Sequence, residues 1–361
     1  MRLFVLFFAV LMSQYSLSEE FAEHPVDISP QALRASYATD QSGFRIALEN
    51  NVFYKATANA VTEFFDPSRP TLVYFHGWRL NNRDRGETVN FNHVLLPENA
   101  VNMWRRAGWN VVYYNWIQYA DDQNFLRAEC RIWSATCSNR NITWLDAEGK
   151  LNYLDEPESL SARIADEWMA AFGTRLDMNQ ELRFLGHSLG TQLAIAVADE
   201  LLKNYDVAID RLALTDLTSS VIGKRFLNGE WVGRRAFEIA EDLIQAGTAI
   251  ENYRCWQVSR TFPLDQNIPF DQLVLTIERK LDFTAGGLID FSAQDAQHRA
   301  CFLTYFWSIE QGPSDDNLET FTGASVGTDV VRANHGRLLK QISGESSQTE
   351  NPNDDQYEIA N

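Results

Sequence analysis

The residues from Gly186 to Gly190 read Gly, His, Ser, Leu, Gly, which is the pattern G-x-S-x-G. An apolar run precedes the pattern and a longer apolar stretch follows it, so the sequence predicts a strand, a sharp turn and a helix. Glycines flank the serine because larger side chains would strike the neighbouring strand and helix. Such a turn lifts the serine clear of the sheet, so we predict that Ser188 is a nucleophile.

A serine hydroxyl is a weak nucleophile near neutral pH, so it needs a histidine as general base and an acid that orients the histidine. On this kind of turn the three residues follow the chain order Ser, Asp or Glu, His. Only His298 and His335 come after Ser188. We favour His298, which follows a predicted strand through a glycine-containing loop and stands at the start of a predicted helix. His335 is the alternative, with a surface histidine as its plainer explanation.

Two aspartates are candidates for the acid. Asp216 comes directly after a predicted strand at 211–215. Asp265 follows the next predicted strand, which is a second position where hydrolases of this kind carry the acid. We favour Asp216 and keep Asp265 as the alternative.

Two backbone N–H groups are predicted to stabilise the negative oxygen that develops when the serine attacks. Leu189 supplies one because it directly follows the nucleophile. Trp78 supplies the other, because His76, Gly77 and Trp78 come directly after a buried strand at 71–75. Both donors are backbone groups, so the side chains there are free to shape the pocket for the acyl group.

These segments resemble the pancreatic-type lipase family of α/β-hydrolases over roughly residues 71 to 310. The resemblance implies a carboxylic ester hydrolase that cleaves a lipid or another acyl ester through an acyl-enzyme intermediate. It also supports Asp216 over Asp265, and Trp78 as an oxyanion donor. The segments that carry it are Phe75 to Trp78, Asn110 to Trp116, Gly186 to Gly190, Thr215 with Asp216, and His298 with Arg299.

The sequence also departs from the family. Leu217 stands where the family has a proline after the acid, and no cysteine-bracketed lid precedes His298. We also expect no C-terminal β-sandwich domain. Interfacial activation and a colipase-like partner are therefore not implied.

Strands and helices alternate along the chain, which predicts a doubly wound, mostly parallel α/β sheet of the α/β-hydrolase type. Residues 117–157 break this rhythm and are expected to form an insertion that caps the active site as a lid. The predicted strands cover 44–48, 52–54, 71–75, 110–116, 211–215, 253–262 and 272–278, and the predicted helices 95–107, 157–173, 231–246 and 298–309. A strand and turn are predicted at 182–190, followed by a helix whose apolar residues lie between 193 and 202.

The N-terminus reads as an export signal. Arg2 precedes an apolar run from Leu3 to Met12, and Ser16, Leu17 and Ser18 form a small-x-small site. We expect a signal peptide at 1–18 with cleavage after Ser18, and a secreted or periplasmic protein. The hydrolase domain is expected at 19–340. The acidic stretch at 341–361 lacks the apolar residues that would offset ordering and is expected to be disordered.

Four cysteines in an exported chain permit two disulfides, and we favour Cys130 with Cys137 and Cys255 with Cys301. Buried free thiols are the alternative. None of the cysteine spacings suits zinc, and the predicted chemistry implies no metal and no cofactor.

The formal net charge is −18, with an isoelectric point near 4.7. This charge argues against nucleic acid or an anionic membrane as a partner. A neutral, apolar acyl ester is the expected substrate, and transient contact with a lipid surface is compatible with it. A non-catalytic binding protein on the same fold, or an amide or thioester hydrolase, stays an alternative, and the oligomeric state is left open.

Overall fold

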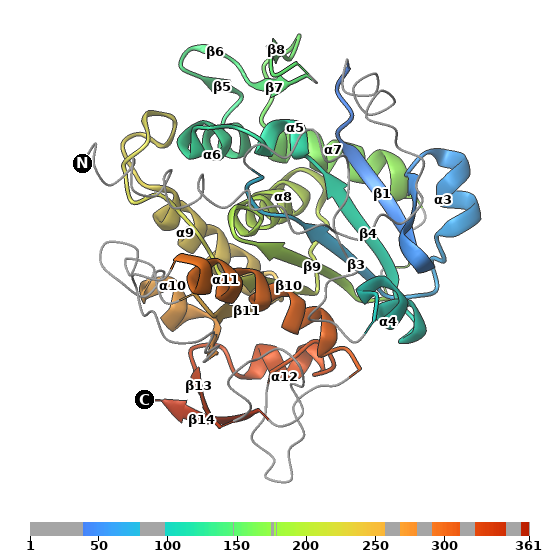
Figure 1. Cartoon of the computed structure of the whole chain (residues 1–361), viewed down its shortest axis with the longest axis vertical. Coiled ribbons are helices and arrows are strands. Elements are labelled where there is room, and N and C mark those ends of the chain that lie inside the picture. The colour runs from blue at the N-terminus through green and yellow to red at the C-terminus, as the bar shows by residue number, and fades with distance from the viewer. Residues whose placement is uncertain are drawn as a thin grey trace.

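The structure, a computed structural model, describes residues 39–79, 98–146, 148–174, 177, 179–256, 268–279, 291–310, 322–343 and 355–360. Within these residues one sheet of ten strands runs through the molecule (Figure 1). In chain order its strands are β1 (Gly43–Leu48), β2 (Val52–Lys55), β3 (Thr71–Phe75), β4 (Asn110–Asn115), β9 (Leu182–His187), β10 (Arg211–Thr215), β11 (Ala249–Arg254), β12 (Leu275–Glu278), β13 (Leu338–Ser343) and β14 (Gln356–Ala360).

The strands are ordered β14-β13-β12-β11-β10-β9-β3-β4-β1-β2 across the sheet. All neighbours from β4 to β13 in this order run parallel. At the two sides, β1, β2 and β14 are antiparallel to their neighbours. The predicted mostly parallel α/β sheet is therefore confirmed. Because the inner strands are parallel, the carboxyl ends of β3, β9, β10 and β11 share one edge.

Helices cover both faces of the sheet, because each inner strand buries side chains on both sides. Val73 and Phe75 of β3 belong to one core, and Leu72 and Tyr74 to the other. The first core is closed by α3 (Ala58–Phe64), α7 (Leu160–Phe172), α8 (Leu189–Tyr205), α9 (Val232–Gln245) and α10 (Ile268–Leu273). The second core is closed by α4 (Ala100–Arg106), α11 (Phe291–Trp307) and α12 (Thr328–Ala333).

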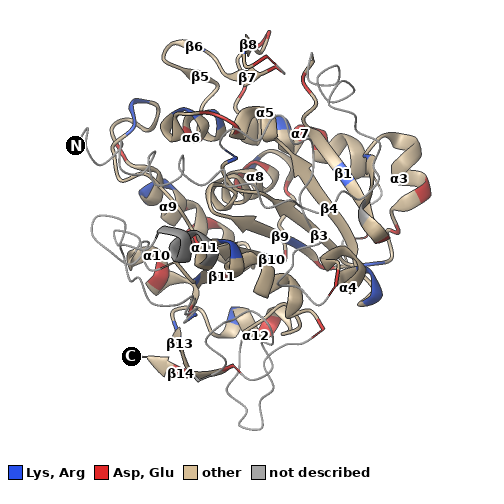
Figure 2. Ribbon diagram, in the orientation of Figure 1, with Lys and Arg blue, Asp and Glu red and all other residues tan. Residues whose placement is uncertain are grey.

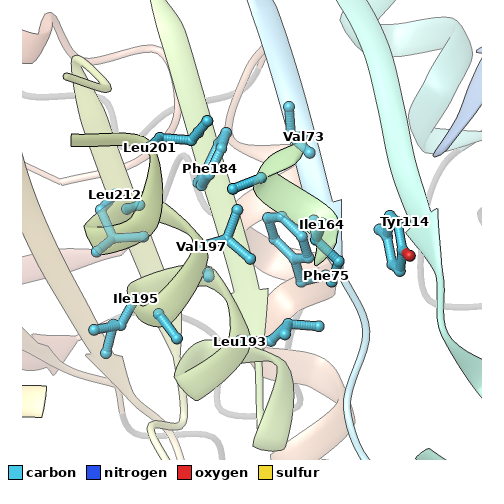
Figure 3. Close-up of a cluster of buried hydrophobic side chains, with 14 of the residues drawn as sticks. Val73, Phe75, Tyr114, Ile164, Phe184, Leu193, Ile195, Val197, Leu201 and Leu212 are labelled. Carbon is cyan, nitrogen blue, oxygen red and sulfur yellow. The ribbon is translucent and has the colours of Figure 1, made fainter. Parts of the chain in front are cut away.

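The first core shows how α8 is held on the sheet. Figure 3 shows Phe75 and Phe184 from the strands beside Leu193 and Val197 of the helix. All four side chains are completely buried. This packing fixes the first turns of α8 directly behind β9, which is where the predicted nucleophile lies.

The insertion at 117–157 contains two short helices and two small hairpins. They are α5 (Ile117–Ala120), α6 (Phe125–Trp133), β5 (Thr136–Cys137) with β6 (Arg140–Asn141), and β7 (Thr143–Leu145) with β8 (Leu151–Tyr153). The hairpins lie at the top of Figure 1, beyond α5 and α6. Both helices contribute buried residues to the first core, so this part of the insertion packs as part of the domain.

Both expected disulfides are present, Cys130 with Cys137 and Cys255 with Cys301. Such bonds are typical of proteins from an oxidising compartment. Among the described residues, no helix has both the length and the apolar character needed to cross a membrane. The expected signal peptide at 1–18 lies outside the described residues.

Three predicted elements are placed differently by the structure. The strand expected at 272–278 is β12, which begins at Leu275, because residues 268–273 form α10. The strand expected at 253–262 is β11, which begins at Ala249 and ends at Arg254. The strand can begin before Tyr253 and contain Glu251 because the charge of this residue is buried against Arg211, and residues 257–262 of the expected strand lie outside the described residues. The helix expected at 298–309 is α11, which already begins at Phe291, so His298 lies inside a helix rather than at its start.

The expected disorder of 341–361 is wrong for part of this stretch. Residues 356–360 form β14, which pairs antiparallel with β13. The low apolar content concealed the strand because its stability comes from backbone pairing at the side of the sheet. Leu339 of β13 is buried, and Tyr357 of β14 packs on the second core, whereas Ile342 and Ile359 are exposed.

The central strands differ in how they carry charge. No Lys, Arg, Asp or Glu occurs in β3 or β4 (Figure 2). In contrast, β10 and β11 hold the ion pair between Arg211 and Glu251, whose side chains are both 0% exposed. Arg211 Nε and Nη2 donate to the two carboxylate oxygens at 2.8 and 2.9 Å. The hydroxyl of Tyr253 also donates to this carboxylate at 3.0 Å.

Removing one partner of this buried pair should destabilise the protein strongly. We expect Glu251→Gln to lower the free energy of unfolding by about 3 to 5 kcal/mol, because it leaves the Arg211 guanidinium buried without a countercharge. Arg234→Ala breaks an exposed pair with Glu238 and should cost less than about 1 kcal/mol. Urea unfolding of both variants measures the difference, and equal losses would contradict the expectation.

Candidate active site

Ser188 lies in the sharp turn between β9 and α8. Its backbone angles are φ 54° and ψ −124°, a conformation that residues with a side chain rarely adopt. Hydrogen bonds to both backbone polar groups of Ser188 hold the turn. The Ser188 N–H donates to the carbonyl of Thr215 at 3.0 Å, and its carbonyl accepts from the Thr191 N–H at 3.1 Å. The predicted strand, turn and helix around Ser188 are confirmed.

The glycines of the motif are explained by close backbone approaches. A Cβ on Gly190 would collide with the carbonyl oxygens of Phe75 and His76, at the end of β3. A Cβ on Gly186 would lie 2.6 Å from Thr191 Cα. A third glycine, Gly77, lies close to Ser188 itself, since a Cβ there would be 2.8 Å from Ser188 Cβ. The turn after β9 and the loop after β3 are therefore in direct contact.

Asp216 and His298 form a buried pair. Asp216 directly follows β10, and its Oδ2 is 3.1 Å from His298 Nδ1. The Oδ1 atom of the same carboxylate accepts from the backbone N–H groups of Cys255 and Trp256, at 2.7 and 2.9 Å. A neutral imidazole donates to the carboxylate through Nδ1, which leaves Nε2 as the basic atom. Among the described residues, no hydrogen bond reaches His298 Nε2, and the atom is buried.

The imidazole of His298 lies between two rings. The ring centroid of His187 is 4.5 Å away and that of Trp256 is 4.8 Å away. His187 directly precedes Ser188 in the chain, so its contact brings His298 to the nucleophile turn. The His187 ring also packs against Phe302, one turn further along α11, with 4.5 Å between the two ring centroids.

The histidines next to His298 and Ser188 are held neutral by burial. Burial lowers the pKa of His187 well below its usual range, and the nearby His298 adds to this effect. Burial also lowers the pKa of His76 to about 3. The Nδ1–H of His76 donates to the Gly77 carbonyl at 2.8 Å, and its ring stacks on Trp116. Both His76 and His187 are therefore neutral near neutral pH.

The two residues expected to donate to the oxyanion, Leu189 and Trp78, lie next to the Ser188 turn. Leu189 is the first residue of α8, so its N–H has no intrahelical partner. Trp78 follows Gly77, which touches Ser188. The Trp78 indole Nε1–H donates to the carbonyl of Asp122 at 2.7 Å, and its ring meets Phe125 edge-on. The insertion therefore holds the loop that carries the second expected donor.

The alternative acid, Asp265, and the alternative base, His335, are not part of this arrangement in the described residues. Asp265 lies outside the described residues. His335 is half-buried, and its Nε2 accepts from the Ile250 N–H at 2.9 Å. Ile250 lies near the start of β11, whereas Asp216 bonds to residues at and beyond the end of β11. The structure therefore pairs His298 with Asp216 at the carboxyl edge, beside the His187 ring that directly precedes Ser188, and places His335 toward the other end of the strands.

A buried polar cluster that the sequence did not reveal ties the insertion to this site. Glu129 of α6 is completely buried, and its carboxylate accepts from Gln192 Nε2 at 3.0 Å and from the hydroxyl of Ser220 at 2.6 Å. Lys224 Nζ lies 2.5 Å from the same carboxylate. Gln192 is in the first turn of α8, and Ser220 follows Asp216 in the chain. Periodicity had no signal for this cluster because its members are far apart in sequence.

One group of described residues has the composition of a metal site. An oxygen of Asp216 and the sulfurs of Cys255 and Cys301 lie within 4.8 Å of one another. The two sulfurs are bonded to each other, so they are not available as thiolate ligands.

The neutral histidines predict acid sensitivity. Unfolded imidazoles bind protons near pH 6.5, whereas folded His76 and His187 do not, so the unfolded state binds more protons below this pH. The free energy of unfolding should fall as the pH drops below 6.5, with a slope that approaches about 1.4 kcal/mol per pH unit for each histidine near pH 5. Urea unfolding should give a shallower slope for His76→Phe, which keeps a ring against Trp116. An unchanged slope would contradict the neutral state of His76.

No family model and no curated protein matches the chain. Among solved structures, it is similar to a fungal esterase from Rhizomucor miehei, with 12% identity over 64% of this chain and 82% of that chain and a TM-score of 0.24. It is also similar to a thermostable esterase from Pseudomonas putida, with 14% identity, 76% of each chain covered and a TM-score of 0.25. Scores this low carry no argument about function, and the resemblance to pancreatic-type lipases is not confirmed.

Proposed function

We propose that the protein is a serine hydrolase of carboxylic esters on an α/β-hydrolase fold. The observation that carries the proposal is the buried Asp216–His298 pair beside the nucleophile turn. A carboxylate that fixes Nδ1 of an imidazole, together with a serine on a strained turn, is the arrangement that activates a serine hydroxyl. Its place at the carboxyl edge of a parallel sheet supports the same assignment.

In the proposed reaction, Ser188 Oγ attacks the ester carbonyl and His298 Nε2 takes its proton. Asp216 keeps the imidazole in the required tautomer and stabilises the imidazolium that forms. The N–H groups of Leu189 and Trp78 donate to the oxyanion. His298 then returns the proton to the leaving alcohol, and water releases the acid from Ser188 in a second cycle.

The proposed substrate is a neutral ester with an apolar acyl group. Trp78 and Phe125 are half-buried aromatic side chains that meet edge-on. Trp78 follows Gly77, which lies against Ser188, and Phe125 belongs to the insertion. Such rings favour apolar groups over charged ones. The proposed location is outside the cell or in a periplasm, supported by the two disulfides and by the export signal expected at 1–18.

Two substitutions test the proposed roles of Ser188 and Asp216. Ser188→Ala should lower kcat for a short-chain p-nitrophenyl ester by about 10⁴ to 10⁶-fold, because it removes the nucleophile. Asp216→Asn should lower kcat by about 10⁴-fold, because the amide favours the wrong tautomer of His298. Both variants should bind substrate and unfold much as the wild type does.

The control for the acid is Asp206→Asn. Asp206 is an exposed aspartate with φ 56°, close to the φ of 53° at Asp216, and asparagine tolerates this conformation. This variant should keep wild-type kcat. Full activity in Ser188→Ala would contradict the proposed reaction.

The insertion is proposed to shape the acyl pocket, and truncation of one ring tests this role. Phe125→Ala should raise KM for long-chain esters more than for short ones, because it removes an apolar ring beside Trp78. Tyr153→Ala removes an exposed ring from β8 of the same insertion. It should leave the ratio of KM for long-chain esters to KM for short-chain esters unchanged. KM measured over a series of acyl lengths gives the answer, and equal effects of the two substitutions would count against the proposed pocket.

A further inference from the structure

We propose that the Cys255–Cys301 disulfide is a positioning element for the Asp216–His298 pair. The bond joins the segment that holds the aspartate to the helix that carries the histidine. The catalytic consequence of this inference rests on the proposed hydrolase function, but the positioning itself does not.

The acid side of the pair is held by the first half of the disulfide. Cys255 directly follows β11, and its N–H donates to Asp216 Oδ1 at 2.7 Å. The next N–H, of Trp256, donates to the same oxygen at 2.9 Å. These two bonds use one carboxylate oxygen and orient the other, Oδ2, toward the histidine. The orientation of Asp216 therefore depends on where residues 255 and 256 lie.

The base side is held by the second half. Cys301 is three residues after His298 in α11, so both side chains project from nearly the same face of the helix. The Cys301 sulfur also lies 3.6 Å from the carbonyl oxygen of Tyr253 in β11. A rotation or shift of α11 that moves the buried His298 ring would also move Cys301. The disulfide to Cys255 opposes this movement.

The disulfide also lies directly against the pair. Both sulfurs and an oxygen of Asp216 are within 4.8 Å of one another. Cys255 and Cys301 are 2% and 0% exposed. The bond spans 46 residues of sequence, whereas the other disulfide joins Cys130 and Cys137 across only 7 residues within the insertion. The chain therefore contains its own matched control.

A single hydrogen bond of 3.1 Å joins Asp216 to His298, and a helix freed from the disulfide can shift without breaking a covalent bond. Displacement of a catalytic group by about 1 Å can lower a rate by about 10²-fold. Loss of the disulfide should therefore lower kcat by about 10²-fold and affect KM much less. A merely stabilising disulfide would lower the unfolding temperature and leave kcat of the folded protein unchanged.

The test uses the full chain and a readout that does not need activity. The Nδ1–H proton of a histidine bonded to a carboxylate gives a low-field proton NMR signal, which His298→Gln identifies by its loss. The signal is recorded for Cys255→Ala/Cys301→Ala, for Cys255→Ala/Cys301→Val, which refills the buried volume, and for the control Cys130→Ala/Cys137→Ala. Thermal unfolding and kcat are measured on the same samples.

We expect both variants at 255 and 301 to fold, to lose or broaden the His298 signal and to lose about 10²-fold in kcat. The control should keep the His298 signal, because its disulfide joins neither the segment that holds Asp216 nor the helix that carries His298. Retention of the signal and kcat in either variant overturns the proposal. Failure of both variants to unfold cooperatively also overturns it, because the disulfide would then serve the fold itself. A wild type that shows the signal but hydrolyses no ester would contradict the proposed function and leave the positioning result readable.

Discussion

The approach of α8 to the end of β3 is the constraint on which the site depends. Gly190 lies so close to the carbonyls of Phe75 and His76 that no side chain fits between them. This approach is possible because apolar side chains of α8 pack fully buried on the strands. It brings two loops together, the turn with Ser188 and the segment with Gly77 and Trp78. The placement of the proposed nucleophile beside the proposed oxyanion donors is thus a consequence of one packing contact.

The Asp216 carboxylate is the second point at which separate parts of the chain meet. One oxygen is bonded to the backbone after β11 and the other to a histidine 82 residues further along the chain. The insertion adds further hydrogen bonds around the site. The backbone carbonyl of Asp122 accepts from Trp78, and the carboxylate of Glu129 accepts from Gln192 and Ser220. Buried charges of this kind are costly unless they are paired, and here they connect the segments around the site.

The sequence predicted what is local and could not predict what depends on distant partners. The turn at Ser188 follows from five consecutive residues. Chain order left two histidines as candidates, and positions relative to predicted strands favoured His298 over His335 and Asp216 over Asp265. The boundary of β11 was missed because Glu251 is neutralised by Arg211, which lies 40 residues earlier. The pairing of β14 with β13 was missed because it depends on backbone hydrogen bonds between two segments rather than on an apolar side-chain pattern. The donors to Asp216 Oδ1 are backbone groups, which leave no mark on the amino-acid sequence.

The central claim is that Ser188 is a nucleophile activated by His298. The most direct measurement is to treat the full-length protein with a fluorophosphonate and to map the modified residue by mass spectrometry. The account predicts one covalent adduct on Ser188, formed much more slowly when His298 is replaced by glutamine. An unlabelled Ser188 in the folded wild-type protein would contradict the account and favour a binding protein on the same fold.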